Sequence, residues 1–376
     1  MLPRVYHLLT ESEPFAEHDG GAISRWAAHV LRHDEDAVVL APWADDSWGF
    51  PENRVQPIPQ LLHYKRLQDF TRQKLPWGVR KHLLKSILVS ATRVVGSGDV
   101  LWVHNRPEFA AVLSHSIQKQ GGRLVLHMHN SHLRESDHLR QDLAPDHFVF
   151  VSKFLQTEAQ SILGHLPNST VLYNGASAEV FYPKQNPDAQ KESVPMILLA
   201  SRLVPEKGVH IFVAAMRLLL ERGVQAVGSV VGSSGFGGSK LTGYLRDLRK
   251  QAPPNVTFHE YCVGRALGEK FRQADIFCLP STWHDPFPLV VLEAMACGLP
   301  IVTTNSGGIP EMLTDGGGVL VSRDAVGECA EALEELICNV PLRRRMGSEA
   351  YSSFLKNYTW PAVYANYRNI LRAMPS

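Results

Sequence analysis

Short apolar runs alternate with longer, helix-like stretches along most of the chain. In the first half, four such runs lie at residues 37–42, 99–105, 122–130 and 147–152. They are rich in β-branched and aromatic residues and end in turn or polar residues, which is typical of strands buried in a parallel sheet. Stretches with helical spacing follow the strands, as at 107–122 and 152–164. The pattern predicts the βαβ alternation of a doubly wound sheet.

The alternation stops at residues 182–195 and then restarts. This segment is polar, lacks periodicity and contains three prolines, so we interpret it as a linker. Beyond it, strands are predicted at 196–203, 227–235, 255–261, 275–281 and 300–308. The last part looks helical, with a break expected at Pro361. We predict domains over 1–181 and 196–360, and a C-terminal helix over 361–376 that returns to the first domain.

Composition narrows the class of protein. The 376 residues are 44% apolar and 20% charged, which is typical of a globular chain, and the length suits two domains. A formal net charge of +1 gives no reason to expect a nucleic-acid partner. We see neither a secretory signal nor an apolar run long enough to span a bilayer. The five cysteines include no CxxC pair, which disfavours a disulfide framework and fits the cytoplasm.

Histidines are frequent, and several of the 17 gather at residues 126–139, LHMHNSHLRESDHL. A metal site is one interpretation of this cluster. The cluster lacks HExxH or a comparable ligand spacing, so we predict no metal here.

Two cations follow the strand that opens the second half. The segment 201–208 reads SRLVPEKG and leads into a helix expected to start near Gly208. Arg202 offers a fork of donors and Lys207 a compact charge, which together suit a diphosphate, and a helix N-terminus adds amide donors. The plain alternative is a solvated loop with an ion pair to Glu206.

A second segment, residues 285–298, places two carboxylates around a helix start. The helix should begin near Pro288, with Asp285 in the preceding loop and Glu293 more than one turn inside. Glu293 interrupts an otherwise apolar stretch, where a lone carboxylate is costly unless it is paired or binds a ligand. The pattern favours a binding role over that of an ordinary exposed helix residue.

Glycine-rich turns supply two further candidates. Residues 303–311 run from a strand into a helix, and Gly20 and Gly21 precede another expected helix start. Paired glycines let backbone amides approach an anion, although a plain turn is equally consistent. The run 231–240 lacks the GK[ST] ending of a P-loop, and neither glycine-rich loop matches GxGxxG, which disfavours dinucleotide enzymes.

In this order, the segments resemble glycosyltransferase family 4. The match consists of Gly20-Gly21, YNGASAEVFYP at 173–183, SRLVPEKG at 201–208, DPFPLVVLEAMACG at 285–298 and NSGGIPE at 305–311. It covers most of the chain, with the more specific motifs in the second half. The resemblance implies an α/β protein of GT-B fold, in which two Rossmann-like domains face each other across a cleft. The N-terminal domain would be on the acceptor side, and the C-terminal domain would bind the nucleotide sugar.

The resemblance also implies roles for individual residues. Arg202 and Lys207 would bind the donor pyrophosphate in place of a divalent metal. Asp285 and His129 would contact the donor sugar, and Glu293 would hold the ribose. His127 is the alternative to His129 as the family's histidine. The Gly21 amide would approach the phosphates, and Tyr261 and Val263 would lie near the base. The other implied substrate contacts are Gly20, Asn130, Asn174, Ser201, Gly232, Phe287, Pro288, Leu289 and Val290.

The activity implied is that of a retaining, metal-independent glycosyltransferase. It would move a hexose or N-acetylhexosamine from a nucleotide-diphosphate sugar, with UDP-sugars favoured, to a glycan or lipid-linked acceptor, and would need no cofactor. A weaker likeness at 230–245 indicates cell-surface polysaccharide synthesis. Two departures bear on donor identity: Asp285 replaces the usual Glu, and Pro288 replaces the usual Gly and lacks an N–H. A nucleotide-sugar epimerase of the same fold and a non-catalytic glycan- or nucleotide-binding protein remain alternatives.

A basic segment lies in the first half. Residues 63–93 contain eight Lys or Arg and a single Asp, together with several apolar residues. Peripheral contact with anionic lipid on the inner membrane face would suit a lipid-linked acceptor. A cationic helix packed on its apolar side is the alternative.

Overall fold

The computed structural model describes residues 3–17, 21–71, 76–133, 139, 141–166, 168–184, 194–235 and 242–374. The chain divides into two compact units. Unit 1 consists of residues up to Tyr173 together with those from Val363 onward, and unit 2 runs from Asn174 to Ala362. The sequence placed the corresponding boundaries at 181 and 361. Nine of the predicted linker residues, 185–193, lie outside the described residues.

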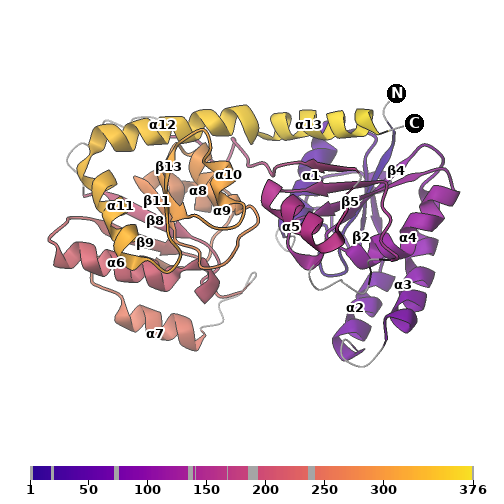
Figure 1. The fold of residues 1–376 in the computed structure, drawn as a ribbon, viewed down its shortest axis with the longest axis horizontal. Helices are drawn as coiled ribbons and strands as arrows, with labels where there is room; N and C mark the ends of the chain where they lie inside the picture. Colours follow the sequence, from indigo (N-terminus) through magenta and orange to yellow (C-terminus); the bar gives the residue numbers. More distant parts are fainter. Residues whose placement is uncertain are drawn as a thin grey trace. The chain divides into compact units, whose positions relative to one another are not determined.

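Unit 1 is built on a seven-stranded sheet in which each described strand pair is parallel. Its strands, in spatial order, are β3 (Val55–Pro57), β2 (Val38–Ala41), β1 (Val5–Leu8), β4 (Val100–His104), β5 (Arg123–Met128), β6 (His147–Phe150) and β7 (Ser169–Val171). The connecting elements are α1 (Ala22–His33), η1 (Glu52–Arg54), α2 (Gln60–Thr71), α3 (Trp77–Ala91), η2 (Thr92–Val94), α4 (Pro107–Lys119) and α5 (Lys153–Leu163). The direction of winding reverses between β1 and β4. Figure 1 labels β2, β4 and β5 of this sheet and the helices that connect its strands.

Unit 2 repeats this plan with a six-stranded parallel sheet. Its strands, in spatial order, are β10 (Val256–His259), β9 (Val227–Val231), β8 (Met196–Ala200), β11 (Ile276–Leu279), β12 (Ile301–Thr304) and β13 (Gly318–Val321). The helical elements are η4 (Pro205–Lys207), α6 (Val209–Glu221), α7 (Gly243–Gln251), α8 (Gly264–Gln273), α9 (Leu289–Ala296), α10 (Ile309–Met312), α11 (Val326–Cys338) and α12 (Val340–Asn357). Here the winding reverses between β8 and β11.

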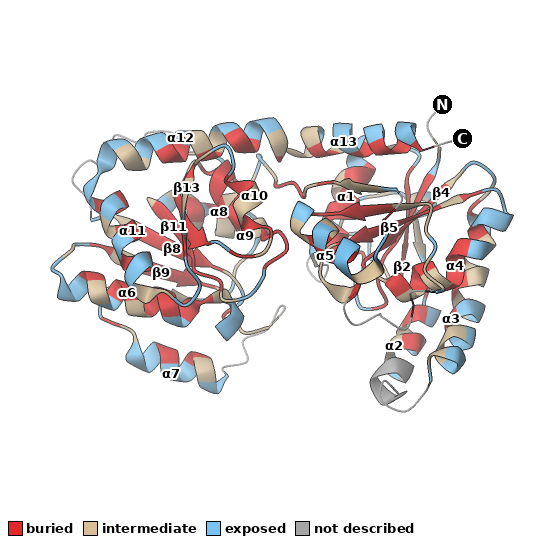
Figure 2. Ribbon diagram, viewed as in Figure 1, coloured by how far each residue is buried: buried red, intermediate tan, exposed pale blue. Residues whose placement is uncertain are grey.

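The core of each unit follows from the apolar runs. The central strands are buried on both faces, whereas most helices bury one side only (Figure 2). In unit 2, Phe212 of α6 and Leu333 of α11 pack in one cluster with Val230 of β9. This burial is the main favourable contribution to folding. Among the described residues, no helix combines the length and apolar character needed to cross a membrane.

The predicted α/β fold class is confirmed, with two details corrected. The sequence did not predict β3, β7 and β13 as strands. The C-terminal helical break also falls earlier than expected, because α13 (Trp360–Ala373) starts just before Pro361. Proline is tolerated in the first turn of a helix, where its missing N–H has no intrahelical partner to lose.

Candidate functional site

The candidate site of unit 2 lies where the winding of its sheet reverses. Strands β8 and β11 are neighbours, but the chain leaves them in opposite directions across the sheet. In such sheets, ligands bind beyond the carboxyl ends of the strands at this switch point. The loop after β8 carries Arg202 and Lys207, and the loop after β11 carries Asp285. Two of the predicted segments therefore flank the place where the fold favours ligand binding.

Lys207 and Asp285 form an ion pair that joins these two loops. The Lys207 ammonium donates to Asp285 Oδ2, and the two side chains are only 14% and 8% exposed. The plain alternative from the sequence was an ion pair to Glu206, but Lys207 pairs with Asp285 instead. Arg202 lies on the same loop and is exposed. The pair holds a cation and a carboxylate side by side in a largely dehydrated position, where electrostatic interactions are strong.

Backbone contacts hold the two loops together. The Glu206 carbonyl accepts hydrogen bonds from Ser281 Oγ at 2.9 Å and from the Thr282 amide at 3.0 Å. Gly208 caps α6 with φ +68°, and a Cβ there would lie 1.7 Å from the Pro280 carbonyl oxygen. Only glycine therefore permits this approach, and it fixes the position of the neighbouring Lys207.

The third predicted segment, after β12, supports Asp285 from the other side. The Gly308 amide donates to the Asp285 carbonyl at 2.8 Å, and Ser306 Oγ contacts His284 Nδ1 at 3.1 Å. Gly307 has φ +62°, and a Cβ there would lie 2.2 Å from the Asp285 carbonyl oxygen. The structure thus brings together the three glycosyltransferase-like segments of the second half around one carboxylate.

Helix α9 begins directly after this loop. Phe287 and Pro288 are buried, and Leu289 and Val290 form the first helical residues. Amides in the first turn of a helix have no intrahelical acceptor and carry the positive end of the dipole. Glu293 lies in the second turn and is half-buried. The predicted helix start is confirmed, and it directs amide donors toward the carboxyl end of the sheet.

Other predicted contact residues follow neighbouring strands. Ser201 comes directly after β8 and Gly232 directly after β9. Tyr261 and Val263 follow the edge strand β10 and are 48% and 40% exposed. Asn174, at the start of unit 2, is buried. Their roles as substrate contacts stay predictions.

In unit 1, His129 and Asn130 lie directly after β5. The backbone amides of both donate to Asn105 Oδ1, at 3.1 and 3.2 Å. Asn105 follows β4 and has φ +55°, a left-handed conformation that Asn tolerates better than most residues. The buried Asn130 Oδ1 accepts no hydrogen bond from the residues that the structure describes. Asn105, which the sequence analysis missed, thus positions two predicted site residues.

The helix start at Gly21 is occupied by an internal carboxylate. Gly20 lies outside the described residues, so only its neighbour can be placed. The Ser24 amide donates to Glu13 Oε1 at 3.1 Å, and a Cβ on Gly21 would lie 2.5 Å from the same oxygen. Burial raises the pKa of Glu13, while hydrogen bonds from the amides of Ser24, Ile23 and Gly21 oppose this. A phosphate at this helix start would compete with Glu13.

The sequence analysis also missed an ion pair at the switch point of unit 1. Arg106, after β4, donates through Nε and Nη2 to both carboxylate oxygens of Glu11, at 2.6 and 2.8 Å. Glu11 follows β1, and its side chain is only 4% exposed. A charged residue two or three positions after the end of each buried strand was the available signal. The bidentate pair joins the two loops in the same way as Lys207 and Asp285 join those of unit 2.

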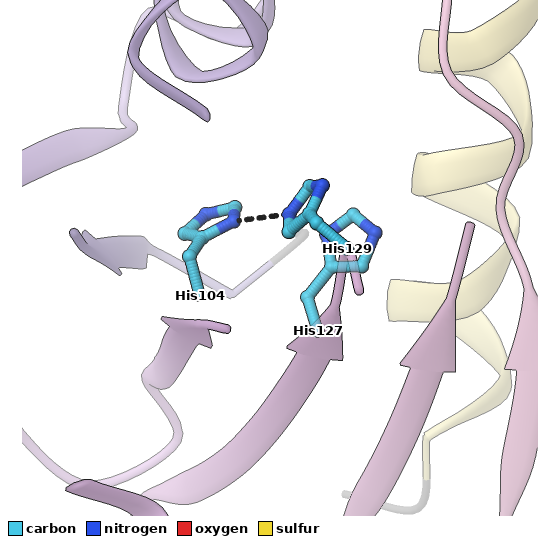
Figure 3. A group of neighbouring side chains, drawn as sticks. All are labelled: His104, His127 and His129. Carbon is cyan, nitrogen blue, oxygen red and sulfur yellow. Dashed lines mark hydrogen bonds between the residues drawn. The ribbon is translucent and has the colours of Figure 1, made fainter. Parts of the chain in front are cut away.

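A histidine cluster lies beside His129. Ring nitrogens of His104, His127 and His129 lie within 4.8 Å of one another, a spacing compatible with a metal ion (Figure 3). However, the Trp102 indole N–H donates to His127 Nδ1 at 3.2 Å. In a neutral imidazole this places the proton on Nε2 and leaves His127 no lone pair for a metal. The cluster is better described as a hydrogen-bonded array than as a set of metal ligands.

Comparisons with known proteins point to one family. The family model described as "Glycosyl transferases group 1" matches residues 183–353. D-inositol 3-phosphate glycosyltransferase of Corynebacterium jeikeium is 30% identical over 74% of this chain and 68% of its own length. Spore coat protein SA of Bacillus subtilis is 24% identical over 72% of this chain and 78% of its own length. The structure of Anabaena HepE in complex with UDP has the same fold, with a TM-score of 0.76, 18% identity and coverage of 98% and 100%.

Proposed function

The chain belongs to the group 1 glycosyltransferases and is an enzyme of GT-B fold, and from this premise we propose a specific reaction. It moves a hexose or N-acetylhexosamine from a UDP-sugar to a glycan or lipid-linked acceptor in cell-surface polysaccharide synthesis. The anomeric configuration is retained, and no divalent metal or other cofactor takes part. The observation that carries this proposal is the Lys207–Asp285 pair at the switch point between β8 and β11.

The difficult event in this reaction is the departure of the nucleoside diphosphate. In our proposal, Lys207 and Arg202 hold the pyrophosphate and offset its growing negative charge, assisted by the amides of Leu289 and Val290 at the start of α9. Because the Asp285 carboxylate holds the Lys207 ammonium in place, little reorganisation is needed. These fixed charges take the role that a divalent cation has in other sugar transferases.

The donor sugar and nucleoside are assigned to individual residues of each unit. Asp285 accepts hydrogen bonds from sugar hydroxyls, and Glu293 accepts them from the ribose. In unit 1, Asn130 Oδ1, which accepts no hydrogen bond from the described part of the chain, suits a hydroxyl donor, and His129 is assigned to the sugar. Tyr261 and Val263 are exposed after β10 and are assigned to the base. UDP is favoured because the structurally similar HepE was solved with UDP.

A screen of nucleotide sugars tests the reaction. We expect one UDP-sugar, and no GDP- or ADP-sugar, to raise the melting temperature, and to be slowly hydrolysed in the presence of EDTA. Transfer to an acceptor should give a product with the donor's anomeric configuration by NMR. Arg202→Ala should lose the thermal shift. Arg222→Ala should keep it, because Arg222 pairs with Glu334 on the surface of the same unit. No shift with any nucleotide sugar, or activity abolished by EDTA, would refute the proposal.

The basic segment is proposed to bring the enzyme to an anionic membrane that carries the acceptor. Helix α3 exposes Val79 and Leu83, at 46% and 41%, and Lys85 is exposed as well. Lys81, by contrast, pairs with Asp142, which also accepts from the Trp77 indole at 3.0 Å. The remaining positive charge can act on lipid headgroups.

Vesicle sedimentation tests this membrane contact. Phosphatidylglycerol-containing vesicles should bind the wild type, and Lys85→Glu should weaken binding by at least about fivefold, because each basic residue near the surface contributes ~1 kcal/mol. Lys119→Glu, a change at an exposed position on α4, should have little effect. Absence of wild-type binding would exclude the membrane contact and leave the sugar-transfer proposal intact.

A further inference from the structure

A chain of hydrogen-bonded rings leads inward from His129. Its Nε2 lies 3.0 Å from His104 Nδ1, and Figure 3 shows these two rings side by side. His104 Nε2 lies 3.3 Å from His7 Nδ1, and His7 Nε2 lies 3.3 Å from the Tyr367 hydroxyl. Both nitrogens of His104 and of His7 are engaged. The four side chains therefore form one continuous path through unit 1.

The sheet register explains how distant residues meet. In β4 and β5, His104 pairs with His127, and Trp102 pairs with Val125, so these side chains share one face with His129. His7 of β1 pairs with Trp102. The rings of Trp26 and Trp102 contact His7, and both are buried.

The path is buried along most of its length. His7, His104 and Tyr367 are 0% exposed, and His129 is partly exposed at the end of β5. Burial lowers the pKa of His7 and of His129 to about 3 and holds the pKa of His104 well below its usual range. Burial also raises the pKa of Tyr367. Near neutral pH the path therefore consists of neutral imidazoles and a protonated phenol.

The hydrogen bonds in this path have one favoured direction. His7 is the hydrogen-bond partner of the Tyr367 hydroxyl among the described residues. If that hydroxyl accepted from His7, its own buried hydrogen would have no acceptor, at a substantial cost. Tyr367 must therefore donate to His7 Nε2, and each neutral ring has a single N–H to pass on. His7 then donates to His104, His104 donates to His129 Nε2, and the proton of His129 resides on Nδ1.

We propose that Tyr367, acting through His7 and His104, is a positioning residue that fixes the tautomer and ring orientation of His129. The inference rests on the proposed function, in which His129 contacts the donor sugar. His129 then offers that sugar a hydrogen-bond donor, Nδ1–H, and never the Nδ1 lone pair. The sugar must present an acceptor oxygen at this position. Through this path Tyr367 of α13, whose residues from Val363 onward belong to unit 1, can set the tautomer of His129 after β5.

Nitrogen-15 NMR of histidine-labelled protein tests the tautomer without any ligand. In the wild type, we expect His129 to carry its proton on Nδ1, with the signal assigned by its loss in His129→Gln. Tyr367→Phe keeps the packed ring but removes the donor, so His7 and His129 should become mixtures of tautomers. Tyr364→Phe, the same change three residues earlier on α13, should leave both unchanged. A wild-type His129 protonated on Nε2, or tautomers unaffected by Tyr367→Phe, would overturn the proposal.

Kinetics with the donor found in the screen provide the second readout. Tyr367→Phe should lower kcat/KM for the donor by about fivefold to tenfold, which is the range of one neutral hydrogen bond. The increase in the protein's melting temperature on adding UDP should stay unchanged. Tyr364→Phe should match the wild type. If the tautomers change but kcat/KM does not, the link to His129 function is refuted. If the wild type binds no nucleotide sugar, the proposed function fails, while the NMR result still decides whether Tyr367 sets the tautomer.

Discussion

The Lys207→Ala enzyme is expected to lose sugar transfer by a factor of ~10²–10³, the range found when a preorganised stabilising group for developing negative charge is removed. Lys207 is fixed by Asp285 at the switch point of unit 2, where the leaving diphosphate is proposed to lie. The loss should appear mainly in kcat, because the charge on the leaving group grows in the transition state. Steady-state kinetics with the donor from the screen, in the presence of EDTA, give the measurement.

Loss of stability must be separated from loss of chemistry in this variant. Asp285 is largely buried, and removing one member of a buried ion pair costs about 3–5 kcal/mol because the remaining charge has no partner. Adding Asp285→Asn to Lys207→Ala should therefore restore much of the free energy of unfolding, measured by denaturant titration. Transfer should remain lost in the double variant, because neither change replaces the cation.

A second lysine in the same unit provides the matched control. Lys184 pairs with Asp275 at 3.0 Å, and both side chains are about one-fifth exposed, at 21% and 20%. Asp275 precedes β11 and so lies at the opposite end of the strand from Asp285. Lys184→Ala should reduce stability but leave kcat near the wild-type value. If folded Lys207→Ala kept a substantial part of wild-type kcat, Lys207 would be a structural residue only.

The sequence predicted the parts of the fold that local pattern determines. Strands such as β4 and β11 are buried on both faces, so each appears as an uninterrupted apolar run. The helix start at Leu289 was readable because Pro288 and an apolar stretch follow a polar loop. The missed strands are short and less buried, as in β3, where no residue is fully buried, and therefore lack this signal.

Contacts between distant segments could not be predicted in this way. The Lys207–Asp285 pair depends on β8 and β11 being neighbours, and nothing local in either loop specifies that order. For this reason the sequence offered only the nearby Glu206 as an ion-pair partner for these cations and did not anticipate the pair of Lys207 with Asp285. The link between His7 and Tyr367 spans nearly the full chain and likewise requires the folded sheet and the return of α13. Local patterns thus identified the loops, while the sheet order decided which residues meet.

The buried histidines should make the enzyme sensitive to mild acid. His7, His104 and His127 are 0% exposed, and burial depresses the pKa of each, that of His7 to about 3. In the unfolded chain a histidine has a pKa of ~6.5. Below that value the unfolded chain binds protons that the folded protein does not, so stability is fully present above pH ~6.5 and falls as the pH decreases. The neighbouring rings of Trp26, Trp102 and Tyr367 supply no negative charge to reverse this.

The size of this effect follows from the number of histidines. Each one costs up to ~1.4 kcal/mol per pH unit once the pH is well below 6.5, so the three together remove up to about 4 kcal/mol per unit from a typical stability of ~5–15 kcal/mol. We expect the melting temperature, followed by circular dichroism, to fall steeply between pH 7 and 5.5, before most carboxylates titrate. His7→Phe should make the free energy of unfolding less dependent on pH, by the equivalent of about one bound proton. The exposed change His115→Gln on α4 is the control and should leave this dependence as it is. A melting temperature that stays constant over this range would mean that the folded cluster accepts protons itself, and the neutral hydrogen-bonded path from Tyr367 to His129 would have to be reconsidered.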